Sequence, residues 1–239
     1  MDTISTLLLT GENNHDWRTS SPFLAKLLEE SGRFNVTIAE DAGAALEDAT
    51  ALSAYELIFS DYNGPDWSEQ ACTNFENAIA GGAGLVIFHA ANNCFNGWTA
   101  FEKMCGLKWV AEKGSSHGDF VDFKVEIKNP DHPITAGMQD FDHIDELYNG
   151  TINPHGVDVD VLATAFSNES EGGSGKDEPV LVALPYGEGR VFHNLLGHVW
   201  PGDPWPGYRG CSLVAFETPG FQKTLMRGCE WAATGTATL

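Results

Sequence analysis

Histidine side chains stand at three points where the sequence pattern predicts the end of a buried strand. His15 follows an apolar segment near the N-terminus, His89 follows the run 85–88, and His198 follows a third apolar segment. Histidine changes charge near neutral pH and its neutral ring binds divalent metals, so either acid–base catalysis or metal binding fits these positions. No HExxH or HxH string is present. The cofactor is therefore left open, with a divalent metal such as zinc on these three histidines as the candidate.

His89 occupies a predicted junction between a strand and a turn. The unbroken apolar run 85–88 is typical of a strand buried on both faces, and a loop rich in Asn and Gly follows it. In α/β proteins such a junction can hold a catalytic residue on a tight elbow. The other interpretation is a buried histidine that caps the end of the strand. We favour a position that faces a cleft, and expect His89 and His198 to act as acid, base or ligand.

Glu146 and Tyr148 lie two residues apart on a segment with an extended pattern. They would therefore point to the same face, where a carboxylate and a phenol can share a sugar hydroxyl or a proton transfer. An exposed strand face would give the same pattern, with Leu147 in the core. The candidate catalytic residues are His89, Glu146 and His198. The candidates for substrate binding are His15, Asp16, Trp17, Asn63, Asn92, His132 and Tyr148.

These side chains must be positioned by an α/β sheet. Apolar segments that end in polar loops alternate with helical patterns, which predicts parallel strands with helices on both faces. Strands are predicted near residues 4–10, 34–39, 55–60 and 84–89, with helices near 20–32 and 68–80. Ser20 or Ser21 is expected to cap the first helix, with Pro22 in its first turn. The loops that follow parallel strands share one edge of the sheet, so the candidate residues should converge there.

The pattern changes after residue 119. Residues 121–127 alternate apolar and polar side chains, and no long amphipathic helix separates them from 158–165. Residues 179–184 and 190–196 are joined by a short Gly-rich turn that is typical of a hairpin. These segments predict antiparallel additions to the sheet, closed by an amphipathic helix near 221–231. The whole chain, 1–239, is expected to form one domain.

The composition narrows the class of function. The 239 residues include 34 acidic and 13 basic side chains, a formal net charge of -21. Such a surface repels phosphate, so binding to nucleic acid or to an anionic membrane is not expected. Five cysteines without CxxC spacing fit a reducing compartment, and the N-terminal segment resembles neither a signal peptide nor a membrane span. A cytoplasmic protein is expected, and the aromatic-rich segment 200–208 is a candidate surface for a homodimer.

Five motifs appear in the order typical of trehalose-utilisation (ThuA-like) proteins. They are His15-Asp16-Trp17, His89-Ala90-Ala91, His132-Pro133-Ile134 with Gly137, Asp145-Glu146-Leu147-Tyr148, and the stretch from Tyr186-Gly187 to Gly197-His198. The resemblance implies a flavodoxin-like core of the class I glutamine amidotransferase type. Glutamine amidotransferases carry cysteine at the elbow, whereas this chain has His89 there and lacks an acid two residues after His198. Because imidazole cannot replace the acyl-accepting sulfur, we expect no glutaminase activity.

The resemblance also implies a role in carbohydrate metabolism. Members resemble proteins encoded beside sugar dehydrogenases that oxidise glycosides at ring carbon 3. The expected function is therefore an enzyme that acts on a keto-sugar or a 3-keto-glycoside, through a His/Glu cluster in a cleft at the carboxyl ends of the parallel strands. The alternative is a carbohydrate-binding or regulatory module without catalysis. In both cases the expected partner is a sugar-like small molecule.

Overall fold

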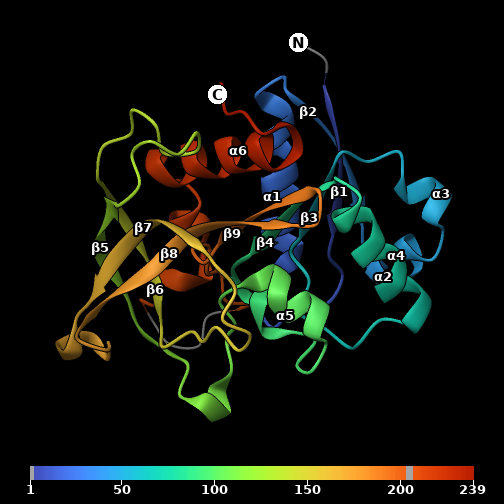
Figure 1. Cartoon of the computed structure of the whole chain (residues 1–239). Helices are drawn as coiled ribbons and strands as arrows, with labels where there is room; N and C mark the ends of the chain where they lie inside the picture. Colours follow the sequence, from blue (N-terminus) through green and yellow to red (C-terminus); the bar gives the residue numbers. More distant parts are fainter. Residues whose placement is uncertain (1–2, 203–206) are drawn as a thin grey trace.

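The computed structural model describes residues 3–202 and 207–239. In these residues nine strands form one sheet in the order β2-β1-β3-β4-β9-β8-β7-β5-β6 (Figure 1). The strands are β1 (Ile4–Leu9), β2 (Phe34–Ala39), β3 (Leu57–Ser60), β4 (Gly84–Phe88), β5 (Ser116–Ile127), β6 (Phe141–Asn149), β7 (Asp160–Ser167), β8 (Lys176–Tyr186) and β9 (Gly189–Asn194). The α-helices are α1 (Trp17–Glu30), α2 (Ala42–Leu46), α3 (Ala49–Leu52), α4 (Glu69–Ala80), α5 (Thr99–Cys105) and α6 (Pro219–Thr234). Short 3-10 helices are η1 (His89–Asn93), η2 (Ala111–Lys113), η3 (Glu169–Glu171), η4 (Arg209–Cys211) and η5 (Leu213–Ala215).

The parallel half of the sheet contains β2, β1, β3, β4 and β9. Successive side chains of a strand point to opposite faces, and β1 shows the consequence: Ile4 and Leu8 pack into one core layer, Leu7 and Leu9 into the other. Both faces of β1, β3 and β4 are covered, which explains their apolar runs, whereas β2 at the edge of the sheet is largely exposed. The predicted α/β class and the four predicted parallel strands are confirmed.

The other half is antiparallel, as predicted. β8 and β9 form the hairpin, β7 pairs with β8, and β5 lies between β7 and β6. β5 begins at Ser116, five residues before the predicted start, because its first part pairs with the end of β6 across a register shift. The closing helix α6 is confirmed near its predicted position.

The predicted start of the first helix was wrong by about one turn. α1 begins at Trp17 with Asp16 as its cap residue, whereas the sequence favours Ser20 or Ser21 at that position. The hydroxyl of Thr19 donates to Asp16 Oδ2 at 2.6 Å, which stabilises the earlier turn. Ser20 and Ser21 instead lie inside the helix and donate to the buried carboxylate of Asp61.

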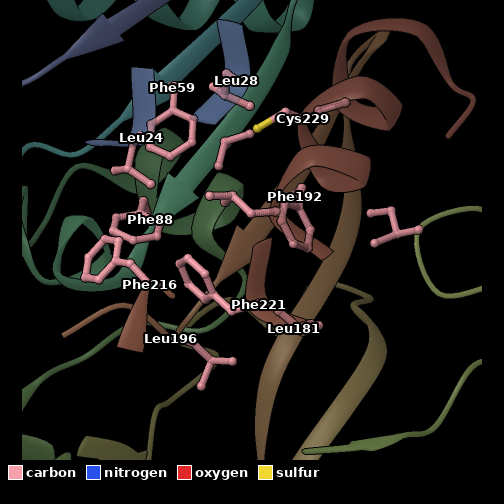
Figure 2. Close-up of a cluster of buried hydrophobic side chains, with 14 of the residues drawn as sticks. Leu24, Leu28, Phe59, Phe88, Leu181, Phe192, Leu196, Phe216, Phe221 and Cys229 are labelled. Carbon is pink, nitrogen blue, oxygen red and sulfur yellow. The ribbon is translucent and has the colours of Figure 1, made fainter. Parts of the chain in front are cut away.

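Two apolar layers enclose the sheet. One lies against α1 and α6 and includes Leu24, Leu28, Phe192 and Cys229 (Figure 2). The other lies against α2, α4 and α5 and includes Phe75. With both faces closed in this way, polar side chains gather at the ends of the strands.

Two expectations from the sequence concern membrane insertion and a surface for a homodimer. None of the helices within the described ranges combines the length and the apolar character that crossing a membrane requires. The segment 200–208, expected to support a homodimer, includes residues 203–206, which lie outside the described residues.

Candidate functional site

Three histidines meet at the carboxyl edge of the parallel half-sheet. His15 follows β1, His89 follows β4, and His198 lies in the loop after β9. Their potential ligand nitrogens all lie within 4.8 Å of one another, and all three side chains are buried. The His15 ring centroid is 4.7 Å from the centroid of each of the other two rings. The convergence expected from the strand-end rule is therefore present.

His89 sits on a strained elbow. β4 ends at Phe88, and His89 itself has a φ of 45°, in the left-handed region that side chains other than glycine rarely adopt. Its Nδ1 lies 2.7 Å from the carbonyl oxygen of Leu195. A carbonyl only accepts, so Nδ1 carries the proton and Nε2 carries the lone pair. Tyr148 places its hydroxyl 3.0 Å from that Nε2.

The tautomer of His15 is fixed in the same manner by two amides. Its Nδ1 lies 3.3 Å from Asn13 Oδ1 and 3.2 Å from Asn14 Oδ1. Asn13 turns its Nδ2 toward Asp61, and Asn63 Nδ2 donates to Asn14 Oδ1, so both atoms that face His15 are oxygens. Nδ1 must therefore be the donor. The Nε2 lone pair points into the cluster, 3.0 Å from Nδ1 of the third histidine.

Glu146 and Tyr208 complete the cluster around His198. Glu146 Oε2 lies 3.2 Å from His198 Nδ1 and 3.3 Å from His117 Nδ1. The Tyr208 hydroxyl donates to Glu146 Oε1 and lies 3.1 Å from His198 Nε2. His198 Nδ1 faces two acceptors, Glu146 Oε2 and the lone pair of His15 Nε2, so its proton lies on Nδ1 in the metal-free protein. Three ring nitrogens and one carboxylate oxygen converge here, joined by the protons of His198 Nδ1 and of the Tyr148 hydroxyl.

Electrostatics favour this neutral state. Burial, together with the neighbouring histidines, lowers the pKa of His15, His89 and His198 to about 3 each. All three rings are therefore uncharged at neutral pH, the state in which imidazole binds metal. Burial raises the pKa of Glu146, an effect that the hydrogen bond from Tyr208 partly offsets. Three neutral imidazoles beside an acidic group match the donor set of catalytic zinc sites, which leave a fourth position open.

Asp145 ties the loop that carries His198 to β6. It is fully buried and accepts hydrogen bonds from the backbone N–H groups of Gly197, at 2.6 Å, and His198, at 3.1 Å. Burial alone would raise the pKa of Asp145, but the hydrogen bond and charge of His143 outweigh it and lower the pKa to about 2. Asp145 is thus an anion that holds the third histidine in place from the antiparallel half of the sheet.

Gly197 supplies the backbone geometry of the same loop. Its φ is 122°, and a Cβ built there would lie 2.2 Å from Cζ of Phe88. Replacing Gly197 with alanine is expected to destabilise the fold by about 3 kcal/mol, from backbone strain and overpacking together. Urea unfolding measures the change in the free energy of unfolding.

Gly137 provides the control. It has a φ of 71°, and a Cβ built there would have nothing within 4 Å, so Gly137→Ala introduces backbone strain without crowding and should cost about 1 kcal/mol. Equal losses for the two variants would contradict the role of crowding.

The other predicted residues are divided between the cluster and distant places. Tyr148 reaches His89, and Asn63 supports the His15 loop through Asn14, whereas Asp16 serves as the cap residue of α1. Asn92 is buried, and neither polar atom of its side chain has a partner in the described part of the chain. Trp17 lines a separate cavity of 170 Å³ with Ile38 and Glu40.

His132 is not brought to the cluster. Its ring centroid lies 4.7 Å from that of Trp231 in α6, whose carbonyl accepts from Arg190 near the start of β9. His132 therefore lies near the start of β9, whereas His198 follows the end of that strand. The neighbouring carbonyls of Pro133 and Ala136 accept from Arg227, so this motif anchors α6.

Several residues of the site had no assigned role in the sequence. Asn13 lies in the His15 loop and carries the usual polar composition of a loop, so nothing distinguished it. Asp145 lies inside a motif, but the catalytic role was assigned to its neighbour Glu146 and no role to Asp145. Tyr208 reaches the site because the chain after β9 folds back toward β6, a contact between segments 62 residues apart.

Cys94 does not provide a nucleophile. Its thiol is buried and donates to the carbonyl of Ala91 at 3.1 Å. Burial raises the pKa of Cys94 well above the ordinary value for a thiol, so the reactive thiolate is disfavoured. A histidine therefore stands at the elbow, and the nearest cysteine stays protonated.

The fold is similar to the folds of several solved structures. A protein named as ThuA-like from Parabacteroides merdae is 33% identical with a TM-score of 0.88, over 100% of this chain and 92% of its own. A second protein named as ThuA-like, from Bacteroides uniformis, is 17% identical with a TM-score of 0.71, over 98% of this chain and 93% of its own. A cytoplasmic protein from Salmonella typhimurium is 12% identical with a TM-score of 0.64, over 96% of this chain and 98% of its own. The fold is the predicted flavodoxin-like, class I glutamine amidotransferase-like one.

The sequence itself matches a family model. The match is to the model described as trehalose utilisation (ThuA) and extends over residues 6–232. No match is found among curated proteins. Because the family model spans nearly the whole chain, this protein belongs to the trehalose-utilisation (ThuA) family.

Proposed function

We propose that this chain is a metal-dependent enzyme of carbohydrate metabolism that acts on a keto-sugar or a 3-keto-glycoside and is not a glutaminase. Membership of the trehalose-utilisation family supports the carbohydrate role. One observation carries the chemistry: one ring nitrogen from each of three buried histidines and a carboxylate oxygen converge at the carboxyl ends of parallel strands. In open α/β sheets this edge is where ligands bind.

A divalent ion such as zinc is the proposed cofactor, held by His15, His89 and His198. Hydrogen bonds to Nδ1 fix the tautomers of His15 and His89, which is the arrangement that surrounds histidine ligands in metal sites. A bound ion of this kind polarises a carbonyl oxygen. A keto-sugar offers such an oxygen, together with weakly acidic protons on the adjacent carbons.

Glu146 is the proposed general base. Burial raises its pKa above the ordinary value of a carboxyl group, and Tyr208 and His117 hold the carboxylate in place beside His198. It would take the proton from the carbon next to the carbonyl group. Trp200 lies at the edge of the cluster, 37% exposed, with its ring parallel to that of His198 at a centroid distance of 6.0 Å. An exposed indole suits the apolar face of a pyranose.

Turnover of 3-keto-glycosides by the zinc-loaded protein tests this proposal. Glu146→Gln should lower kcat by about 10² to 10⁴-fold, the usual contribution of a general base, while metal content stays unchanged. Glu188, exposed in the β8–β9 turn at the opposite end of the sheet, provides the matched control Glu188→Gln. Full activity in Glu146→Gln would contradict the assigned role.

The alternative is a carbohydrate-binding or regulatory module without catalysis. It would show sugar binding by calorimetry and no turnover with any keto-sugar, whereas the enzyme requires both. We place either function in the cytoplasm. The Salmonella typhimurium neighbour is named as cytoplasmic, and Cys94, Cys105 and Cys229 are buried thiols, which suits a reducing compartment.

A further inference from the structure

Asp61 is a buried carboxylate at the same sheet edge that the proposed chemistry does not use. It follows β3, and within the described residues no basic side chain forms an ion pair with it. Its Oδ2 accepts from the hydroxyls of Ser20, at 2.9 Å, and Ser21, at 2.7 Å. Its Oδ1 accepts from Asn13 Nδ2 at 3.2 Å. Every one of these contacts is a donor directed at the carboxylate, which identifies Asp61 as a fixed acceptor.

The Asn13 amide is oriented by this carboxylate together with the backbone carbonyl of Asp61, 3.4 Å from Nδ2, and the backbone N–H of His15. An asparagine amide has one donating and one accepting end, so an amide that gives Nδ2 to Asp61 must turn Oδ1 the other way. Oδ1 indeed lies 3.0 Å from the backbone N of His15 and 3.3 Å from its Nδ1. A reversed amide would present a donor to Nδ1, which would then have to accept. The proton of His15 would move to Nε2, the nitrogen that faces the cluster.

We infer that Asp61 is a positioning residue of the metal site, which acts through Asn13 to keep the proton of His15 on Nδ1 and the lone pair on Nε2. The carboxylate, the amide and the imidazole form one directional chain from β3 to the proposed ion. This inference rests on the proposed function, because the lone pair matters only if His15 is a ligand. Asn14 supports the same tautomer, but it is exposed, so water competes for its hydrogen bond.

Asp61→Asn is the sharpest test, because it preserves the shape of the side chain. The two serine hydroxyls donate to the position of Oδ2 and would therefore select the amide oxygen of the new residue. Its Nδ2 would then face Asn13 Nδ2, donor against donor, which weakens the hold on the Asn13 amide and leaves only the backbone carbonyl of residue 61 and the backbone N–H of His15 to orient it. Two-bond ¹H–¹⁵N spectra of the metal-free protein report which ring nitrogen of His15 carries the proton. Burial raises the pKa of Asp61 to about 7, so the measurement is made at pH 8, where wild-type Asp61 is ionised.

The expected result is an Nδ1–H tautomer in the wild type and a larger Nε2–H fraction in Asp61→Asn, with zinc affinity reduced up to about 10 to 100-fold. Asn13→Ala should act in the same way, and the double variant should be no worse than either single variant, because both lie in one chain. Ser20→Ala is the matched control, since it removes one donor to Asp61 without changing the atom that faces Asn13.

The outcomes of this experiment distinguish failure of the positioning role of Asp61 from failure of the proposed metal site. An unchanged His15 tautomer in both Asp61→Asn and Asn13→Ala would overturn the positioning role, whatever the protein binds. An Nδ1–H tautomer in the wild type and a larger Nε2–H fraction in both variants, without zinc binding, would uphold the Asp61–Asn13–His15 chain and overturn the metal. If Asp61→Asn does not fold, an unchanged tautomer in Asn13→Ala would still overturn the role of Asp61, because Asn13 is the link through which it acts.

Discussion

Replacing His89 with alanine is expected to abolish the binding of one zinc ion per chain while leaving the sheet intact. The wild type should retain one equivalent after dialysis, because three neutral imidazoles already face a common point, and those of His15 and His89 direct their protons outward. Removing one ligand of three leaves a two-histidine site, which does not hold zinc against dialysis. Elemental analysis gives the stoichiometry, and far-ultraviolet circular dichroism shows whether the fold persists.

Two further variants distinguish the loss of a metal ligand from backbone strain and from the removal of a histidine elsewhere in the chain. His89 has a φ of 45°, so alanine there carries strain that glycine avoids. His89→Gly should lose the ion as completely as His89→Ala and be at least as stable. His155, which pairs with Glu102 away from the cluster, gives the control His155→Ala with full occupancy. Zinc retained by both His89 variants would refute the metal site.

The second large effect is a loss of stability in mild acid. The pKa of His15, His89 and His198 lies at about 3 in the fold, through burial and mutual repulsion, against 6.5 for a free side chain. The unfolded chain therefore binds more protons between pH 6.5 and 3. Stability is fully present above pH 6.5 and falls as the pH drops, by about 1.4 kcal/mol per pH unit for each histidine.

Urea unfolding of the metal-free protein at pH 7 and pH 5 measures this loss. The three histidines together predict a fall of roughly 5 kcal/mol in the free energy of unfolding, comparable to the whole stability of many domains. His15→Gln should show a shallower dependence on pH, because one titrating group is removed. Equal stability at pH 7 and pH 5 would show that the rings are protonated in the folded state and would argue against a metal site.

The fold was predictable where local pattern and burial coincide. The runs that became β1, β3 and β4 are apolar because both faces of each strand are covered, and their polar ends located His15 and His89. The start of α1 was not predictable, because Ser20 and Ser21 are typical cap residues whose hydroxyls are used by Asp61, a contact between segments about 40 residues apart.

The limits of prediction at the site have the same physical origin. His132 carries a family motif, yet that motif anchors α6, and residue type alone does not separate an anchor from a ligand. Asp145 and Tyr208 act through contacts with Gly197 and Glu146 that join segments far apart in the sequence. Such contacts depend on how the antiparallel strands close over the parallel ones, which periodicity does not encode.

The division of the site between the two halves of the sheet has a consequence for substitutions in β6. All three histidines follow parallel strands, whereas Glu146 and Tyr148 are delivered by β6, the strand at the far antiparallel edge. The group that would activate the substrate and the group that would move its proton therefore belong to separate modules of one chain. A substitution at Glu146 alone would therefore change the proton transfer and leave the three proposed ligands in place, whereas substitutions at Asp145 or Tyr148 would also disturb His198 or His89.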